Sequence, residues 1–191
     1  PGDVVAHFDG GAAEAQDFEG GVARVDEPAR TYVENQRQRR LPAVDHPYDK
    51  ATAEMIVTAP AHYQVVSNGL LAEETDLPGG RRRTHWRQSV PIAPWLYVLG
   101  VARFAVQHVD TFQGKAIQTW VYAQDREKGF HDFAVPTRAA LEYYADKVGP
   151  FAYEKLANVQ SNSVSGGMEA ASAIFYSESS VVGDRNERWR N

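Results

Sequence analysis

Between residues 41 and 109 the chain repeats short runs of β-branched and aromatic residues, and turn-forming residues separate them. The runs are ATAEMIVTAP, YQVVSNGLLAEE, RRRTHWRQSV and PWLYVLGVARFAVQHV, with APAHY, SNG and DLPGG as the punctuation. Runs of this length that are bounded by Gly, Pro and Asn are typical of strands joined by tight turns. The pattern therefore predicts an antiparallel β-domain of stacked sheets.

Residues 1–40 are rich in Gly, Ala and acidic residues. In this segment we expect loops with one short strand.

The organisation changes near residue 110. KAIQTWVYAQD reads as a further strand, and the apolar spacing of HDFAVPTRAALEYYADKVG favours a helix. Pro136 suits the first turn of that helix, and Gly149-Pro150 would end it. EKLANVQSN then predicts a strand, followed by a Gly-Gly loop and another strand. We expect a β-domain over residues 1–110 and the incomplete start of an α/β domain over 111–191.

Composition narrows the function classes. The 191 residues carry a formal net charge of −5, whereas nucleic-acid-binding proteins usually show a basic excess. The triplet Arg81-Arg82-Arg83 after LPGG is interpreted as a solvated hairpin turn. There is no cysteine, so disulfides and cysteine metal sites are excluded. No apolar run approaches the roughly 20 residues that a membrane span needs. We therefore expect neither nucleic acid nor membrane as a partner, and the compartment stays open.

Spacing alone reveals no complete catalytic site. Six histidines are present, but none lies three or four residues from another, as a zinc pair on one helix would require. One stretch, VSGGMEAASAIFYSESS, places Glu169 beside Gly166 and Gly167. An exposed carboxylate at a strand entrance is the ordinary interpretation. The functional one is that bare glycine backbone admits a ligand, and that the following strand, if it is an edge, accepts an extended peptide whose amino end Glu169 anchors.

The same stretch resembles a known motif. GGMEAASAIFYSES is similar to the Gly-x-Met-Glu-Asn motif and downstream strand of the zinc aminopeptidase family, which contains the alanyl, leucyl and puromycin-sensitive aminopeptidases and leukotriene hydrolase. Further segments over about residues 41–191 agree in order: LPAVDHPYDKATAEMIVTAPAHYQVVSNGLL, HWRQSVPIAPWLYVLGVARF, VGPFAYEKLANVQ and VVGDRNERWRN. The resemblance implies a mainly β fold in which a saddle-like antiparallel β-sandwich precedes the start of a thermolysin-like α/β catalytic domain.

The resemblance also implies a site. In the family the motif glutamate is a residue of the catalytic site that binds the substrate's N-terminal ammonium, and that role maps to Glu169. The resemblance further implies that the residues around Glu169 line the substrate path; these are Gly166, Gly167, Met168 and Ala170. It also implies a second residue from the β-domain that holds the amine, which would be Glu34 or Gln36. The alternative interpretation of the segment that contains Glu34 and Gln36 is a solvated polar loop. Ala170 stands where the family has Asn, whose amide can fix the loop.

The family's zinc helix, with its His-Glu-x-x-His motif, follows the VVGDRNERWRN run and is absent from this sequence. The resemblance thus implies the N-terminal portion of a zinc aminopeptidase, with zinc in the full-length parent and no metal bound by the residues present. Its partners would be a peptide substrate and the remainder of the catalytic domain. We also expect exposed apolar surface around Ile174, Phe175 and Tyr176 in the isolated chain.

Two other functions remain open. Ala170 motivates a non-catalytic peptide-binding homologue on the same scaffold. A carbohydrate-binding β-sandwich would use tryptophans as a sugar platform, although PWLYVLG reads as core; the tryptophans are Trp86, Trp95, Trp120 and Trp189.

Overall fold

The computed structural model describes residues 2–11, 18–25, 46–162 and 164–183, and it is mainly β as predicted. Its strands are β1 (Gly2–Gly11), β2 (Phe18–Val25), β3 (Ala51–Pro60), β4 (Gln64–Ser67), β5 (Leu70–Leu77), β6 (Arg81–Ile92), β7 (Leu99–Ala102), β8 (Phe104–Phe112), β9 (Lys115–Tyr122), β10 (Lys155–Ser161), β11 (Gly167–Ala170) and β12 (Ala173–Ser177). Its helices are α1 (Arg126–Val148) and the short 3₁₀ turns η1 (Pro94–Leu96), η2 (Ala123–Asp125) and η3 (Glu178–Ser180).

The first large sheet is antiparallel and has the order β2-β1-β3-β6-β5. Its first two strands correct the expectation of loops with one short strand at the glycine-rich start. β1 pairs with β3 from Val5 to Gly11, and β2 pairs with the other edge of β1. Main-chain hydrogen bonds to a neighbouring strand therefore organise a segment whose own strand propensity is weak.

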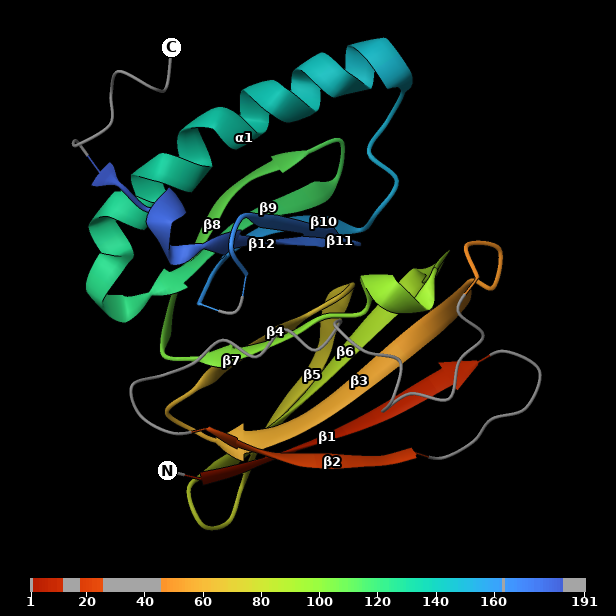
Figure 1. Cartoon of the computed structure of the whole chain (residues 1–191), viewed down its shortest axis with the longest axis vertical. Helices are drawn as coiled ribbons and strands as arrows, with labels where there is room; N and C mark the ends of the chain where they lie inside the picture. The colour runs from red at the N-terminus through yellow and green to blue at the C-terminus, as the bar shows by residue number, and fades with distance from the viewer. Residues whose placement is uncertain (1, 12–17, 26–45, 163, 184–191) are drawn as a thin grey trace.

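The second large sheet has the order β11-β12-β10-β9-β8. β9 and β10 are parallel neighbours, and α1 makes the crossover between them while lying across one face of the sheet (Figure 1). The small β4–β7 sheet lies between the two large sheets (Figure 1). Residues from all three sheets form one core, whose members Val57, Val66, Val101, Val159 and Phe175 are at most 1% exposed.

The helix begins earlier than predicted. It starts at Arg126, so Pro136 lies inside it and not in its first turn. Pro136 has no N–H for the helical ladder, yet one face still packs on the sheet through Gly129, Phe133, Thr137 and Leu141. These residues recur every four positions and are all buried. Packing of this face on the sheet therefore stabilises the helix although Pro136 interrupts its hydrogen bonding.

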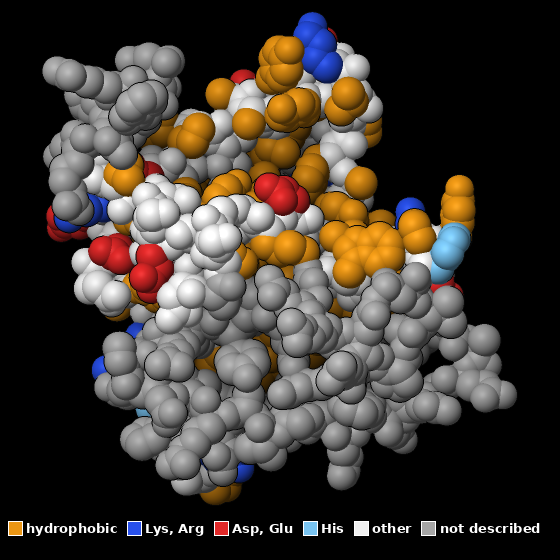
Figure 2. Space-filling view, viewed as in Figure 1, with side chains coloured by type: hydrophobic (Ala, Val, Ile, Leu, Met, Phe, Trp, Pro, Cys, Tyr) orange, Lys and Arg blue, Asp and Glu red, His pale blue; other side chains and the backbone are white. Residues whose placement is uncertain are grey.

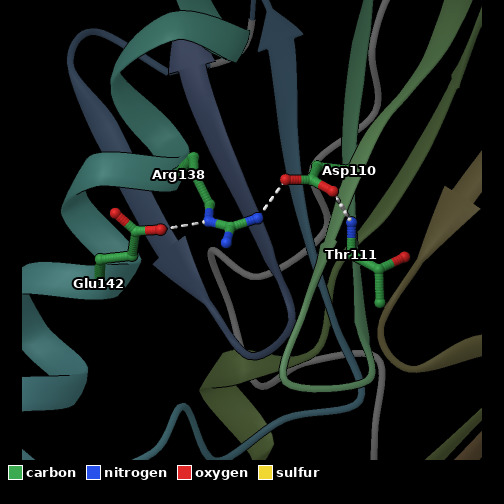
Figure 3. A network of polar contacts seen from close by, with 4 residues as sticks. All are labelled: Asp110, Thr111, Arg138 and Glu142. Atoms are coloured by element: carbon green, nitrogen blue, oxygen red, sulfur yellow. Dashed lines mark hydrogen bonds and ion pairs between the residues drawn. The ribbon is translucent and has the colours of Figure 1, made fainter.

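A polar network attaches α1 to the β8–β9 hairpin (Figure 3). The Arg138 guanidinium lies between the carboxylates of Glu142, at 2.6 Å, and Asp110. Asp110 also accepts a hydrogen bond from the Thr111 N–H at 2.6 Å. That backbone hydrogen bond, together with the Arg138 charge, lowers the pKa of Asp110. The guanidinium also lies over the ring of Phe112.

The arginine triplet belongs to a strand and not to a turn. The hairpin turn is made by residues 78–80, and the arginines begin β6. There Arg82 pairs with Asp76 at 2.8 Å, and Arg83 pairs with Glu73 at 3.1 Å, both across to β5. These cross-strand ion pairs neutralise the local positive charge.

Exposed apolar surface lies elsewhere than predicted. Phe175 is fully buried and Ile174 and Tyr176 are partly buried, so the expectation of an exposed patch around them is wrong. Figure 2 shows hydrophobic side chains over α1, where Tyr143, Tyr144 and Val148 are exposed. None of the helices in the described ranges combines the length and apolar character needed to cross a membrane.

Candidate functional site

The glycine-flanked glutamate lies on an edge strand. Gly167–Ala170 forms β11, which pairs antiparallel with β12 and ends the order of its sheet. Within the described residues no strand pairs with the other side of β11. The sequence pattern had placed a possible edge on the strand after the motif, but the structure places the motif itself there. Main-chain groups along such an edge can hydrogen-bond an extended peptide.

The two faces of β11 have different surroundings. Met168 and Ala170 point into the large core, and Ala170 is 5% exposed. Glu169 alternates to the other face and is exposed. Its cross-strand partner Ile174 packs in the cluster beneath α1 with Leu141 and Leu156. The Glu169 side chain therefore lies on the helix-covered side of the sheet, at its open edge.

The carboxylate of Glu169 lies over bare glycine backbone. A Cβ built on Gly167 would lie 3.0 Å from Glu169 Oε1, whereas one built on Gly166 would meet nothing within 4 Å. Upstream, the carbonyl of Gly166 accepts a hydrogen bond from the Ser177 N–H at 2.8 Å. Gly167 thus leaves space that the carboxylate occupies, and Gly166 continues the antiparallel pairing.

The side chain of Asn68 ties the β11–β12 turn to the first half of the chain. Its Nδ2 donates to the carbonyls of Ala171 at 2.7 Å and Leu96 at 2.8 Å, and its Oδ1 accepts from the Val98 N–H at 2.9 Å. Asn68 is 4% exposed. One buried amide therefore makes three hydrogen bonds to two segments, residues 96–98 and the β11–β12 turn, that lie 28 to 103 residues away in the sequence.

A second set of contacts reinforces this junction. The Gly69 N–H donates to Ser172 Oγ at 2.6 Å, and Lys155 Nζ donates to the Ser67 carbonyl at 2.8 Å. Ser172 has a φ of 63°, in the left-handed region. We call these residues, Ser67, Asn68, Gly69, Lys155, Ala171 and Ser172, the turn junction. It holds the C-terminal end of β11, one residue after Glu169.

Lys155 is an unusual member of the turn junction, because it is fully buried. Burial lowers the pKa of its ammonium to about 7, and the charge of Glu154 opposes that shift. The Nζ atom also lies 5.1 Å from the centre of the Trp86 ring. A lysine in a strand pattern gives no signal of such burial, so the sequence interpretation missed it, as it missed Asn68 and Ser172.

The three tryptophans in the described ranges do not form a platform. Trp86 is 2% exposed and Trp120 is 7% exposed, and their rings meet edge to face at 6.2 Å. Trp95 is 37% exposed, against the expectation that PWLYVLG is core throughout, while Trp189 lies outside the described residues. Among the described tryptophans, no exposed rings therefore lie side by side as a sugar-binding platform would require.

Zinc does not fit the described residues. Among them no group of three or more His, Asp or Glu side chains is arranged to hold a metal ion. Glu34 and Gln36, the two candidates for a second amine-holding residue, lie outside the described residues. Of the sequence-predicted amine-binding candidates, Glu169 is the one that lies within the described residues.

Three comparisons relate the chain to known proteins. Residues 24–96 match the family model described as the Peptidase M1 N-terminal domain. Glutamyl aminopeptidase from Bos taurus is 25% identical over 153 residues, and the human protein is 26% identical over 154 residues. Each alignment covers 78% of this chain and 16% of the relative, so the chain spans about one sixth of their length.

A solved structure shares the fold. It is a mutant of the M1 zinc metallopeptidase from Deinococcus radiodurans, with a TM-score of 0.61 and 21% sequence identity. The match covers 72% of this chain and 33% of that one. The resemblance inferred from the sequence is confirmed as a distant similarity, because the matching family model is an M1 peptidase domain and the relatives are aminopeptidases.

Proposed function

We propose that this chain, whose residues 24–96 match the Peptidase M1 N-terminal domain, is part of a zinc-dependent aminopeptidase that removes single residues from the amino end of peptides. Under this proposal residues 1–110 form the β-domain, and residues 111–191 begin a thermolysin-like catalytic domain. The zinc would be held by residues other than those described.

One observation supports the proposal most strongly. Glu169 is an exposed carboxylate on an edge strand, and the strand's free side can accept an extended peptide. A peptide that paired with β11 would bring its amino end to a carboxylate of opposite charge. A bound peptide would cover part of this exposed carboxylate, and an ion pair that is shielded from water is stronger than one in bulk water. The backbone of the neighbouring residues would then line the substrate path; these are Gly166, Gly167, Met168 and Ala170.

Peptide binding by the chain tests this role. We would measure the affinity of a short peptide with a free amino end, and of its N-acetylated form, by isothermal titration calorimetry. The free amine should bind, and acetylation or Glu169→Gln should weaken binding by at least about tenfold, as expected when a charged hydrogen-bond partner is lost. Glu178→Gln, which alters an exposed carboxylate on η3, is the matched control. Equal binding of the free and acetylated peptides would sink the proposal.

Ala170 favours a second candidate, a non-catalytic peptide-binding homologue on the same scaffold. Its position in the family motif is held by Asn, and Ala supplies no hydrogen bond. Both functions predict that the free-amine peptide binds. A peptide-cleavage assay on the protein purified from its natural source distinguishes the two functions. An aminopeptidase releases the first residue of a bound peptide, whereas a non-catalytic homologue leaves the peptide intact.

A further inference from the structure

Tyr176 lies beside the Glu169 carboxylate. In the β11–β12 pair it stands directly opposite Gly167. Residues opposite one another share a face, and Glu169 is two positions along from Gly167, so all three occupy the α1 side of the sheet. Because Gly167 has no side chain, Glu169 and Tyr176 share the space above it. A Cβ at Gly167 would lie 3.0 Å from Glu169 Oε1 and 4.0 Å from Tyr176 Cδ1.

The helix fixes the position of the Tyr176 ring. Phe133, which is 7% exposed on α1, lies 5.1 Å from it between ring centres, with 32° between the ring planes. Tyr176 itself is half-buried. Burial raises the pKa of its phenol, and the Glu169 carboxylate raises this pKa further. The two groups are therefore electrostatically coupled, and the phenol is uncharged at neutral pH.

We propose that Tyr176 is the second residue of the amine site: an ammonium group that pairs with Glu169 also contacts the Tyr176 ring. This inference rests on the proposed function. The ring attracts the cation through its π-system, and it excludes water from one side of the ion pair. The pair suits a primary ammonium, such as the amino end of a peptide, because its three N–H donors can reach the carboxylate while its charge faces the ring.

Binding of L-alaninamide, a small primary ammonium, tests the inference in the 191-residue chain. Tyr176→Leu should weaken binding about three- to tenfold, the usual range for a cation–π contact. Tyr176→Phe keeps the ring and should bind within about twofold of the original chain. Tyr144→Leu, a matched change at an exposed tyrosine on α1, should leave the affinity unchanged.

A second measurement does not depend on the folding of the leucine variant. The ring protons of Tyr176 can be followed by NMR at about pH 6, where an α-amino group with a pKa of about 7.7–8.0 is protonated and L-alaninamide is a cation, with Tyr176→Phe identifying the signals. Saturating L-alaninamide should shift these signals, and Glu169→Gln should abolish the shift. Tyr176 ring signals that do not respond to the bound amine contradict the inference.

The outcomes separate the two claims. If Tyr176→Leu binds the amine as well as the original chain while Glu169→Gln does not, the inference fails and the proposed function stands. If the original chain does not bind L-alaninamide or the free-amine peptide, the proposed function fails and the inference fails with it.

Discussion

Replacing Asn68 with Ala should strongly destabilise the chain, because this amide makes three hydrogen bonds across the turn junction. The change leaves the carbonyls of Leu96 and Ala171 and the N–H of Val98 without their partner. Val98 and Ala171 are each 1% exposed, so water cannot readily replace the amide there. At about 1–2 kcal/mol for each of the three groups, the loss sums to roughly 3–6 kcal/mol. That is a large part of the stability of an ordinary domain.

Urea unfolding followed by tryptophan fluorescence measures this loss. Asn68→Asp keeps the acceptor for Val98, but it buries a charge and directs a carboxylate oxygen at the carbonyls of Leu96 and Ala171, so it should destabilise the chain at least as much as the alanine variant. Asn162→Ala, at an exposed asparagine, should change stability by less than about 0.5 kcal/mol. A loss below about 1 kcal/mol in Asn68→Ala would refute the idea that the junction anchors β11. Amide hydrogen exchange at residues 167–173 should accelerate in the same variant.

Three further predictions concern buried positions. The lowered pKa of Lys155 means that the unfolded chain binds more protons than the folded chain between about pH 7 and 10.5, so the free energy of unfolding should rise with pH in this range. Lys155→Met should flatten this rise, which can be measured by comparing urea midpoints across the range. An unchanged slope in the variant would contradict the burial of the charge. Gly129→Ala adds a Cβ 2.5 Å from Val121, which is fully buried, so overpacking of about 1–3 kcal/mol should outweigh a helix-propensity gain of about 1 kcal/mol, and a raised melting temperature would contradict this. Gly69→Ala should destabilise by more than about 3 kcal/mol by the same assay, because its φ is +70° and its Cβ would lie 1.9 Å from a carbonyl oxygen of β6; Gly166→Ala is its harmless control.

Local patterns predicted most of the strands. ATAEMIVTAP and KLANVQS are rich in apolar and β-branched residues, and both are strands, β3 and β10. Patterns failed where long-range pairing decides the outcome. GDVVAHFDGG is a strand because β3 supplies its hydrogen bonds, and Pro136 lies within a helix because packing on the sheet holds that helix together. Neither influence is visible within a short window of sequence.

The site was predictable only in outline. The motif indicated Glu169 and its bare glycine neighbours, because those features are adjacent in the sequence. The residues that hold it in place are not adjacent: Asn68 contacts Ala171 from 103 positions away, and Lys155 reaches Ser67 from 88. A serine-asparagine-glycine run reads as an ordinary turn, and nothing in it indicates which distant carbonyl the amide will bind. The role of Glu169 in binding an amine stays a prediction.

The structure changes how the departure at Ala170 is understood. A loop-fixing amide in the family motif suggested that Ala170 leaves Glu169 poorly placed. Ala170, however, lies on the core face of β11, opposite to the face that carries Glu169, and it is 5% exposed among apolar neighbours. The substitution therefore removes no group next to the carboxylate. An amide still fixes this turn, but Asn68 supplies it from the other half of the chain through the Ala171 carbonyl. Accordingly, the placement of Glu169 depends on the contacts between the β4–β5 turn and the β11–β12 turn. A change in the β4–β5 turn should therefore affect the position of Glu169 more than a change at residue 170.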